Sequence, residues 1–86
     1  MSYEIIWKAG ASRDMDRLPL AIASAVVEFI YGPLAQNPHG VGKPLRFELA
    51  GKHSARRGNY RVIYEIFETA VQVDVIAVQH RADGYR

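Results

Sequence analysis

The sequence predicts a small α+β domain, with two N-terminal helices packed on one face of an antiparallel β-sheet, in the order β-α-α-β-β-β. An apolar run with three- and four-residue spacing lies between two regions rich in β-branched and aromatic residues. Turn-forming residues separate the later strand-like runs, so each run can pair with its neighbour. The 86 residues suffice for a single domain, residues 1–86, with a small core.

The start of the chain predicts a strand and a short helix. Tyr3–Lys8 is aromatic and β-branched, as strands commonly are, and Ala9-Gly10 is expected to break it. Ser12 is expected to be the N-cap of a helix that ends near Leu18. Asp14 would then lie in the first turn, where a negative charge suits the helix dipole.

A second helix is expected from Pro19 to Tyr31, or as far as Ala35, because apolar residues recur at helical spacing. Gly32-Pro33 should bend or stop it. Glu28 is the only charged residue in this stretch, so the apolar surface is wider than a small sheet needs. Two interpretations stay open: a wide core-facing stripe, or a helix that a partner chain partly covers.

The rest of the chain predicts a loop and a run of strands. The loop covers residues 36–44, which contain two prolines and two glycines. Gly58-Asn59 is expected to turn the chain, and alternation predicts Val73, Val75 and Ala77 on one face of the last strand. Strands are expected over Leu45–Leu49, His53–Arg57, Tyr60–Phe67 and Val71–Val78.

The composition limits where the protein can be located and which kinds of site it can contain. The chain has no cysteine, which excludes a disulfide scaffold, a thiolate metal site and a cysteine nucleophile. It shows no apolar run of transmembrane length and no signal-peptide pattern. We therefore expect a soluble, cytoplasmic protein with no membrane partner.

Positive charge is concentrated in the second half of the chain. Residues 1–42 carry three basic and four acidic residues, whereas residues 43–86 carry eight basic and five acidic residues. A solvated basic face is one interpretation, and contact with an acidic partner such as nucleic acid is the other. Six of the cations fall in one segment: Lys43, Arg46, Lys52, Arg56, Arg57 and Arg61.

The sequence also argues against several classes of site. The three histidines are far apart in the chain, and no HExxH-like pattern, P-loop or dinucleotide-binding fingerprint occurs. We therefore expect neither a metal nor a cofactor. A cationic site with an aromatic side chain can cleave RNA without a metal. Fixed arginines stabilise the charge that develops when a ribose 2′-OH attacks the adjacent phosphate, and an aromatic ring can hold a splayed base.

Two motifs carry a family resemblance: Arg56-x-Gly58-x-Tyr60-Arg61-x-x-Tyr64 and His80-Arg81-x-Asp83-x-Tyr85. Together with segments 11–19 and 42–51, they resemble the RelE family of bacterial toxins, and most closely its actinobacterial RelE/RelG branch. The resemblance covers nearly the whole chain. It implies the toxin of a type II toxin-antitoxin system, an mRNA endonuclease that cleaves mRNA in the ribosomal A site and so inhibits translation.

The resemblance implies roles for individual residues. Arg61 matches the arginine that grips the scissile phosphate, Arg81 an arginine that assists at the leaving group, and Tyr85 the aromatic residue that packs on the mRNA base. Lys52 and His80 complete the expected catalytic set, since either could act as the general base, as could His53. The expected RNA-binding residues are Lys43, Arg46, His53, Arg56, Arg57 and Arg86.

The partners implied are a cognate RelB-type antitoxin, with a heterotetramer as one assembly, the ribosome with its A-site 16S rRNA, and mRNA. Two alternatives stay open. One is a ParE-like toxin that acts on DNA gyrase. The other is a catalytically inactive ribosome- or RNA-binding module, which is conceivable because Ser54 and Gly84 replace residues that are common in the family.

Overall fold

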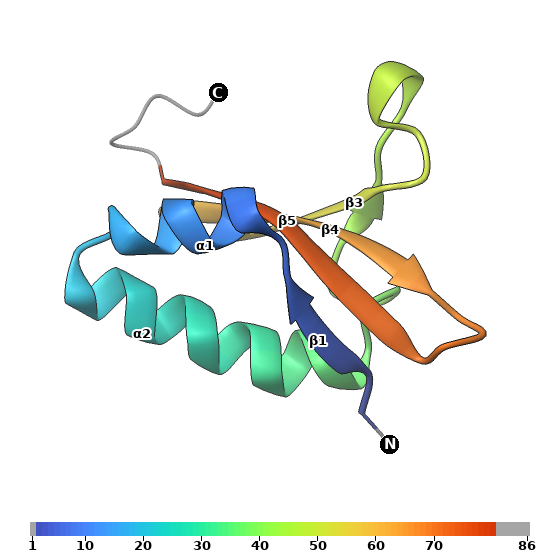
Figure 1. The fold of residues 1–86 in the computed structure, drawn as a ribbon, viewed down its shortest axis with the longest axis horizontal. Helices are drawn as coiled ribbons and strands as arrows, with labels where there is room; N and C mark the ends of the chain where they lie inside the picture. The colour runs from blue at the N-terminus through green and yellow to red at the C-terminus, as the bar shows by residue number, and fades with distance from the viewer. Residues whose placement is uncertain (1, 81–86) are drawn as a thin grey trace.

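The computed structural model describes residues 2–80, and within them two α-helices and five strands form an α+β domain (Figure 1), as the sequence predicts. In the same residues, no helix is long and apolar enough to cross a membrane. The elements, in chain order, are β1 (Glu4–Trp7), α1 (Ala9–Asp16), α2 (Leu20–Phe29), η1 (Ile30–Leu34), β2 (Lys43–Pro44), η2 (Phe47–Leu49), β3 (His53–Arg57), β4 (Tyr60–Phe67) and β5 (Gln72–His80).

The sheet has the strand order β1-β5-β4-β3-β2. The strands β2 to β5 pair antiparallel, as predicted. The strand β1 instead lies parallel to β5, so the sheet is mixed and not purely antiparallel. This pairing joins two segments that are far apart in the chain, Glu4–Trp7 and residues 72–75.

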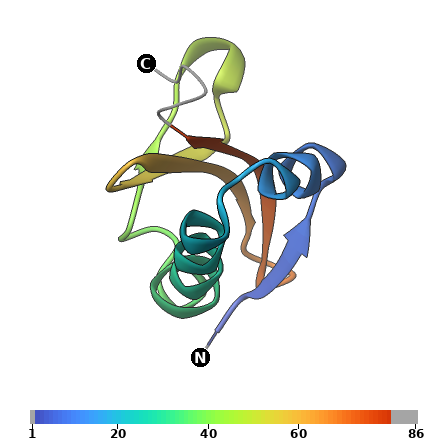
Figure 2. The ribbon, with the colours of Figure 1, turned by 90° about the vertical axis from the view of Figure 1, so that its left-hand side faces the viewer.

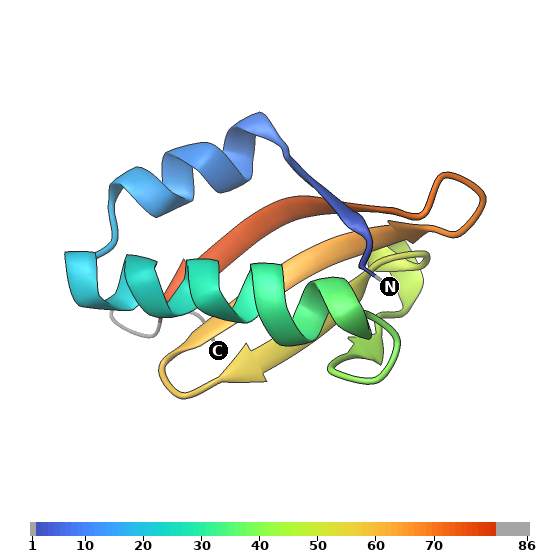
Figure 3. The same cartoon turned by 90° about the horizontal axis from the view of Figure 1, so that it is seen from below.

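One face of the sheet is covered by α2, around which the strands curve (Figures 2 and 3). The register gives the opposite side, which we call the outer face, a defined set of side chains, because residues directly opposite in a pair share a face. These outer-face residues are Ser54, Arg56, Arg61, Ile63, Ala77 and Gln79. The buried core on the α2 side comprises Ala11, Val26, Phe29, Ile30, Leu34, Ala55, Tyr60, Val62, Tyr64, Val73, Val75 and Val78.

The helix α1 begins earlier than predicted. Lys8, not Ser12, occupies the N-cap position, and the Ser12 amide already donates to the Lys8 carbonyl oxygen at 3.0 Å. Gly10 does not break the chain but lies in the first turn, where it lets α1 approach β5. A Cβ at this position would lie 3.3 Å from the Ile76 carbonyl oxygen. Asp14 therefore lies near the end of the helix, and the first-turn role expected for it is wrong.

Asp14 instead ties α1 to the sheet. Its Oδ2 accepts a hydrogen bond of 2.9 Å from the backbone amide of Val78, beyond the end of the β1–β5 pairing. A hydrogen bond to a charged acceptor is worth roughly 1.5–3 kcal/mol. We expect Asp14→Ala to lower the free energy of unfolding by about 2 kcal/mol in urea titrations. Asp14→Asn, which keeps an acceptor oxygen, should lose less, and equal losses in the two variants would contradict this role.

The second helix changes type where the sequence predicts an interruption. Pro19 is its N-cap, and the α-helix ends at Phe29, after which η1 continues as a π-helix that contains Pro33. Proline has no amide hydrogen to donate, so a regular α-helix cannot pass through it unchanged. Part of the apolar surface stays outside the core: Leu20, Val27 and Tyr31 are 82%, 40% and 53% exposed.

The strand expected at Leu45–Leu49 is wrong. Only Lys43–Pro44 pairs with β3, and Phe47–Leu49 forms a short 3₁₀ turn, η2. The apolar alternation that suggested a strand has no core to cover, since Phe47 is 87% exposed and Leu49 is 48% exposed. The segment is a loop that leaves the sheet.

A bulge in β5 breaks the alternation expected for the last strand. Tyr64 is paired with Val75 and Ile63 with Ala77, so Ile76 is an extra residue between them. Ala77 therefore lies on the outer face, and not with Val73 and Val75, while Val78 returns to the core. The bulge also brings Gln79 to the outer face, opposite Arg61.

Candidate functional site

Four basic residues predicted for the site lie on the outer face. Arg56 on β3 lies directly opposite Arg61 on β4, and Lys43 on β2 lies opposite Ser54, a residue of the same face. Lys52 precedes Ser54 by two residues, and its carbonyl accepts the Leu45 amide at 2.8 Å, which continues the β2–β3 ladder. Alternation therefore places Lys52 on the same side. We call Lys43, Lys52, Arg56 and Arg61 the cationic face.

Gln79 orients Arg61, and sequence reasoning did not find this residue. The Nε and Nη2 atoms of Arg61 both donate to the Gln79 Oε1, at 3.0 and 2.7 Å. Two bonds to one acceptor fix the direction of the guanidinium group. Because the acceptor is a neutral amide, it holds Arg61 without neutralising its charge. Its position depends on the β5 bulge, which the sequence pattern does not reveal.

Arg56 and Arg61 place two like charges side by side on the outer face. Residues directly opposite in an antiparallel pair have Cβ atoms roughly 4.5–5.5 Å apart, and like charges at this spacing repel. An anion such as a phosphate group would relieve this repulsion, since arginine forms paired hydrogen bonds with phosphate oxygens.

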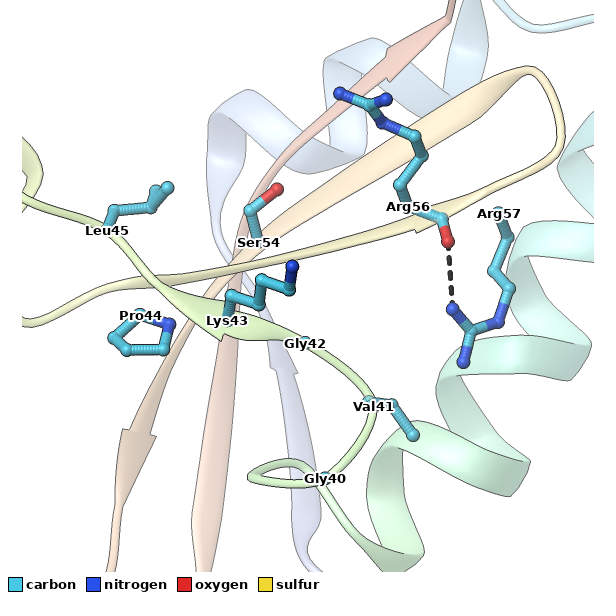
Figure 4. A pocket seen from close by; sticks show the side chains of 9 residues that line it. All are labelled: Gly40, Val41, Gly42, Lys43, Pro44, Leu45, Ser54, Arg56 and Arg57. Carbon is cyan, nitrogen blue, oxygen red and sulfur yellow. Dashed lines mark hydrogen bonds between the residues drawn. The ribbon is translucent and has the colours of Figure 1, made fainter.

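A pocket of about 600 Å³ adjoins the cationic face at the edge of β3. The segment from Gly40 to Leu45, which includes β2, forms one wall, and Ser54, Arg56 and Arg57 form the other (Figure 4). The side chains of Arg56 and Arg57 leave β3 in opposite directions (Figure 4), as neighbouring strand residues must. The pocket thus has a cation at each side of the strand edge.

Arg57, predicted to bind RNA, lies on the α2 side of the sheet. Its guanidinium carbon lies 4.6 Å from the centroid of the Phe29 ring, a cation–π contact, and its Nη1 donates to the Arg56 carbonyl oxygen at 2.8 Å. This side chain packs against the helix layer. The side chain of Arg57 therefore lies on the opposite face of the sheet from Arg56 and Arg61, although Arg56 and Arg57 both line the pocket.

His53 is also on the α2 side. Its ring stacks on Tyr64, with centroids 5.6 Å apart, and lies 5.8 Å from the ring of His39. Burial, and to a smaller extent His39, lowers the pKa of His53, which favours the neutral imidazole. Among residues 2–80, the buried Nδ1 of His53 has no hydrogen-bond partner. The ring is therefore a packing element of the hairpin edge.

The remaining predicted site residues lie elsewhere. His80 ends β5 opposite Tyr60, on the α2 side of the sheet. Arg46 is exposed and immediately precedes η2, away from the β3–β4 pairing. Arg81, Tyr85 and Arg86 lie outside the described residues. Within residues 2–80, no three His, Asp or Glu side chains lie close enough together to hold a metal ion.

Comparisons with known proteins agree with the fold and with the motifs. The family described as the ParE toxin of the type II toxin-antitoxin system parDE matches residues 5–85. Toxin RelE of Mycobacterium tuberculosis is 51% identical over 84 residues, which cover 98% of this chain and 87% of that protein. Toxin RelG of the same organism is 50% identical over 86 residues, covering 100% of this chain and 99% of the relative.

Solved structures place the chain in the same group. The toxin-antitoxin complex RelBE2 of M. tuberculosis contains a chain that superposes with a TM-score of 0.92 at 47% identity, covering 94% of this chain and 100% of the other. The isolated RelE toxin of Escherichia coli shares the fold, with a TM-score of 0.76 at 16% identity over 92% of this chain and 84% of the other. The chain therefore belongs to the RelE/ParE family of toxins of type II toxin-antitoxin systems.

Proposed function

We propose that this toxin is a metal-independent endoribonuclease that binds in the ribosomal A site and cleaves the mRNA there. The observation that carries the proposal is the guanidinium of Arg61, which is oriented by Gln79 and faces Arg56. A pair of fixed cations on a rigid sheet suits a phosphate group whose charge increases during the reaction.

The proposed reaction is attack by a ribose 2′-oxygen on the adjacent phosphate. A bond forms between this oxygen and phosphorus, and the bond from phosphorus to the 5′-oxygen breaks. The 2′ proton passes to a base, and the leaving 5′-oxygen gains a proton. The products are a 2′,3′-cyclic phosphate and a 5′-hydroxyl. Arg61 and Arg56 would stabilise the phosphoryl oxygens, whose negative charge is greatest in the transition state.

The proton transfers are assigned to residues on or near the cationic face. Lys52 is proposed as the base, because strand alternation places it on the same side of the sheet as Arg56. His53 is less suited, since its ring packs on Tyr64 on the other side of the sheet. From the family motif alone, Arg81 is proposed to act at the leaving group, and Tyr85 is proposed to pack on the mRNA nucleobase.

A RelB-type antitoxin is the proposed regulatory partner. The relatives in the RelBE2 complex of M. tuberculosis and in the RelBE complex of E. coli are bound to antitoxins. We expect an acidic antitoxin segment to cover the cationic face, because opposite potentials match at such interfaces. The exposed apolar side chains of Leu20, Val27 and Tyr31 are a second surface that an antitoxin helix could bury.

The test is 5′-end mapping of an mRNA on programmed ribosomes. The buffer contains EDTA and keeps enough free divalent ions for the ribosome. We expect cuts confined to A-site codons, which require the wild-type protein and disappear with Arg61→Ala. Cuts at other positions, or cuts retained in the variant, would contradict the proposed site.

A gyrase-directed activity is the second candidate function, because the matching family is described as ParE toxins. It predicts intact mRNA, no ribosome binding and inhibition of DNA supercoiling in a gyrase assay. Intact mRNA with the protein still bound to ribosomes would instead indicate a non-catalytic binding module.

A further inference from the structure

The loop from Leu45 to Lys52, which we call the 45–52 loop, projects from the sheet on the side away from α2 (Figures 1 and 2). It connects β2 to β3 and contains the 3₁₀ turn η2. This is the side that carries the cationic face, so the loop stands beside the proposed site. The family motif assigns no role to its tip.

The 45–52 loop is held by its own backbone. The Leu45 amide donates to the Lys52 carbonyl at 2.8 Å and closes the base of the loop. Within it, the Leu49 amide donates to the Arg46 carbonyl at 3.1 Å, and the Lys52 amide donates to the Leu49 carbonyl at 3.1 Å. A fourth bond, of 3.0 Å, joins the Ala50 amide to the Phe47 carbonyl. The loop is thus a preorganised structure.

Phe47 is the side chain that this loop presents. It is 87% exposed, the most exposed of the large apolar side chains in the described part of the chain. Its φ angle of +61° lies in the left-handed region, where non-glycine residues are uncommon and a bulky side chain is an outlier. Strained residues of this kind cluster at sites where a ligand is held.

The charge around Phe47 indicates the class of ligand. Arg46 precedes it and Lys52 closes the loop, while Glu48 is the one acidic residue among the eight. Lys43 lies on β2, just before the loop, and Arg56 lies on β3, just after it. An aromatic ring between cations is the usual arrangement for unpaired nucleotides, since the ring stacks on a base and the cations contact phosphates.

We propose that Phe47 stacks on an unpaired base of structured RNA, with Arg46 on a flanking phosphate. Under the function proposed above, on which this inference rests, that RNA is ribosomal RNA near the A site. The 45–52 loop would then position the toxin on the ribosome, while the cationic face acts on the mRNA. Phe47 would be a binding residue that touches no reacting atom.

The experiment compares Phe47→Ala, Phe47→Leu and Phe47→Trp in ribosome-binding titrations and in single-turnover mRNA cleavage. Loss of one base stack should weaken ribosome binding about tenfold in Phe47→Ala. The rate at saturating ribosomes should stay within about twofold, because binding energy alone changes affinity and not the chemical step. Phe47→Leu should bind ribosomes as weakly as Phe47→Ala, and Phe47→Trp should bind at least as tightly as wild type. All four residues carry a Cβ at the same left-handed position, so none of the variants gains the conformational freedom of a glycine.

Phe67→Ala is the control, because Phe67 is an exposed aromatic residue, 38% exposed, at the far end of β4. It should bind ribosomes like wild type. Unchanged binding by Phe47→Ala, or full binding by Phe47→Leu, would overturn base stacking. A variant that loses affinity for the antitoxin but not for ribosomes would overturn it too, and would make the loop a protein-binding surface. If wild type does not bind ribosomes, the proposed function itself fails, which is distinct from a failure confined to the Phe47 series.

Discussion

Replacing Arg61 with alanine is expected to lower the single-turnover rate of mRNA cleavage on ribosomes by about 100- to 1,000-fold, the usual effect of removing one donor to a developing oxyanion. Arg61 is held by two hydrogen bonds to Gln79, so it supplies an oriented charge that a mobile side chain would not. The free energy of unfolding should change by no more than about 1 kcal/mol, because losing the bonds to Gln79 is offset by removing one of two facing cations. Quench-flow cleavage and urea titration measure the two effects.

Arg57→Ala is the matched control for Arg61→Ala. Both are arginines of the same hairpin, but Arg57 lies over the Phe29 ring on the α2 side. It should retain cleavage within a few-fold and lose roughly 0.5–1 kcal/mol of stability with its cation–π contact. If Arg57→Ala slows cleavage as much as Arg61→Ala does, the assignment of catalysis to the outer face is wrong.

Replacing Tyr64 with alanine is expected to cost about 3–5 kcal/mol of unfolding free energy, as other aromatic truncations in cores do. Tyr64 is fully buried, and its hydroxyl donates to the Pro38 carbonyl at 2.6 Å. Burial raises the pKa of Tyr64 to about 12, so the hydroxyl stays protonated and can donate across the working pH range. A domain of this size has only about 5–15 kcal/mol to lose, so thermal unfolding should show a large decrease in Tm.

Tyr64→Phe distinguishes the contribution of the hydroxyl to stability from that of the ring. It keeps the packing against the core and loses only the bond to the loop, which is worth about 1 kcal/mol. A cost equal to that of Tyr64→Ala would mean that the hydrogen bond, and not the ring, stabilises the fold. The same contact holds the loop before β2 against the sheet. Gly42 leaves room for this contact, because a Cβ there would collide with the Tyr64 hydroxyl and the Ser54 carbonyl.

Local sequence patterns predicted the elements whose interactions are local. β3 and β4 have the bounds expected from the sequence, His53–Arg57 and Tyr60–Phe67, because a Gly-Asn turn joins two β-forming runs. The placement of Arg56 and Arg57 on opposite faces follows from strand alternation alone. The composition and the motif residues also indicated the family to which the chain belongs.

Other features could not be predicted from local pattern. Leu45, Phe47 and Leu49 alternate as a strand would, but a strand needs a partner along its length, and β3 pairs only with Lys43–Pro44 on that edge. The helix α1 begins at Ala9 because Gly10 can lie close to Ile76, a residue that is distant in the chain. In each case a long-range contact overrode the local preference.

The sequence by itself determined the fold class, the hairpin and the concentration of positive charge in the second half of the chain. The tertiary structure decided which cations act together. The bulge at Ile76 turns Gln79 to the outer face and gives Arg61 its partner, and the pairing of β3 with β4 sets Arg56 opposite Arg61. The physical reason is that a one-residue shift in a strand exchanges its two faces, and the shift depends on pairing between strands and not on the residues of either one.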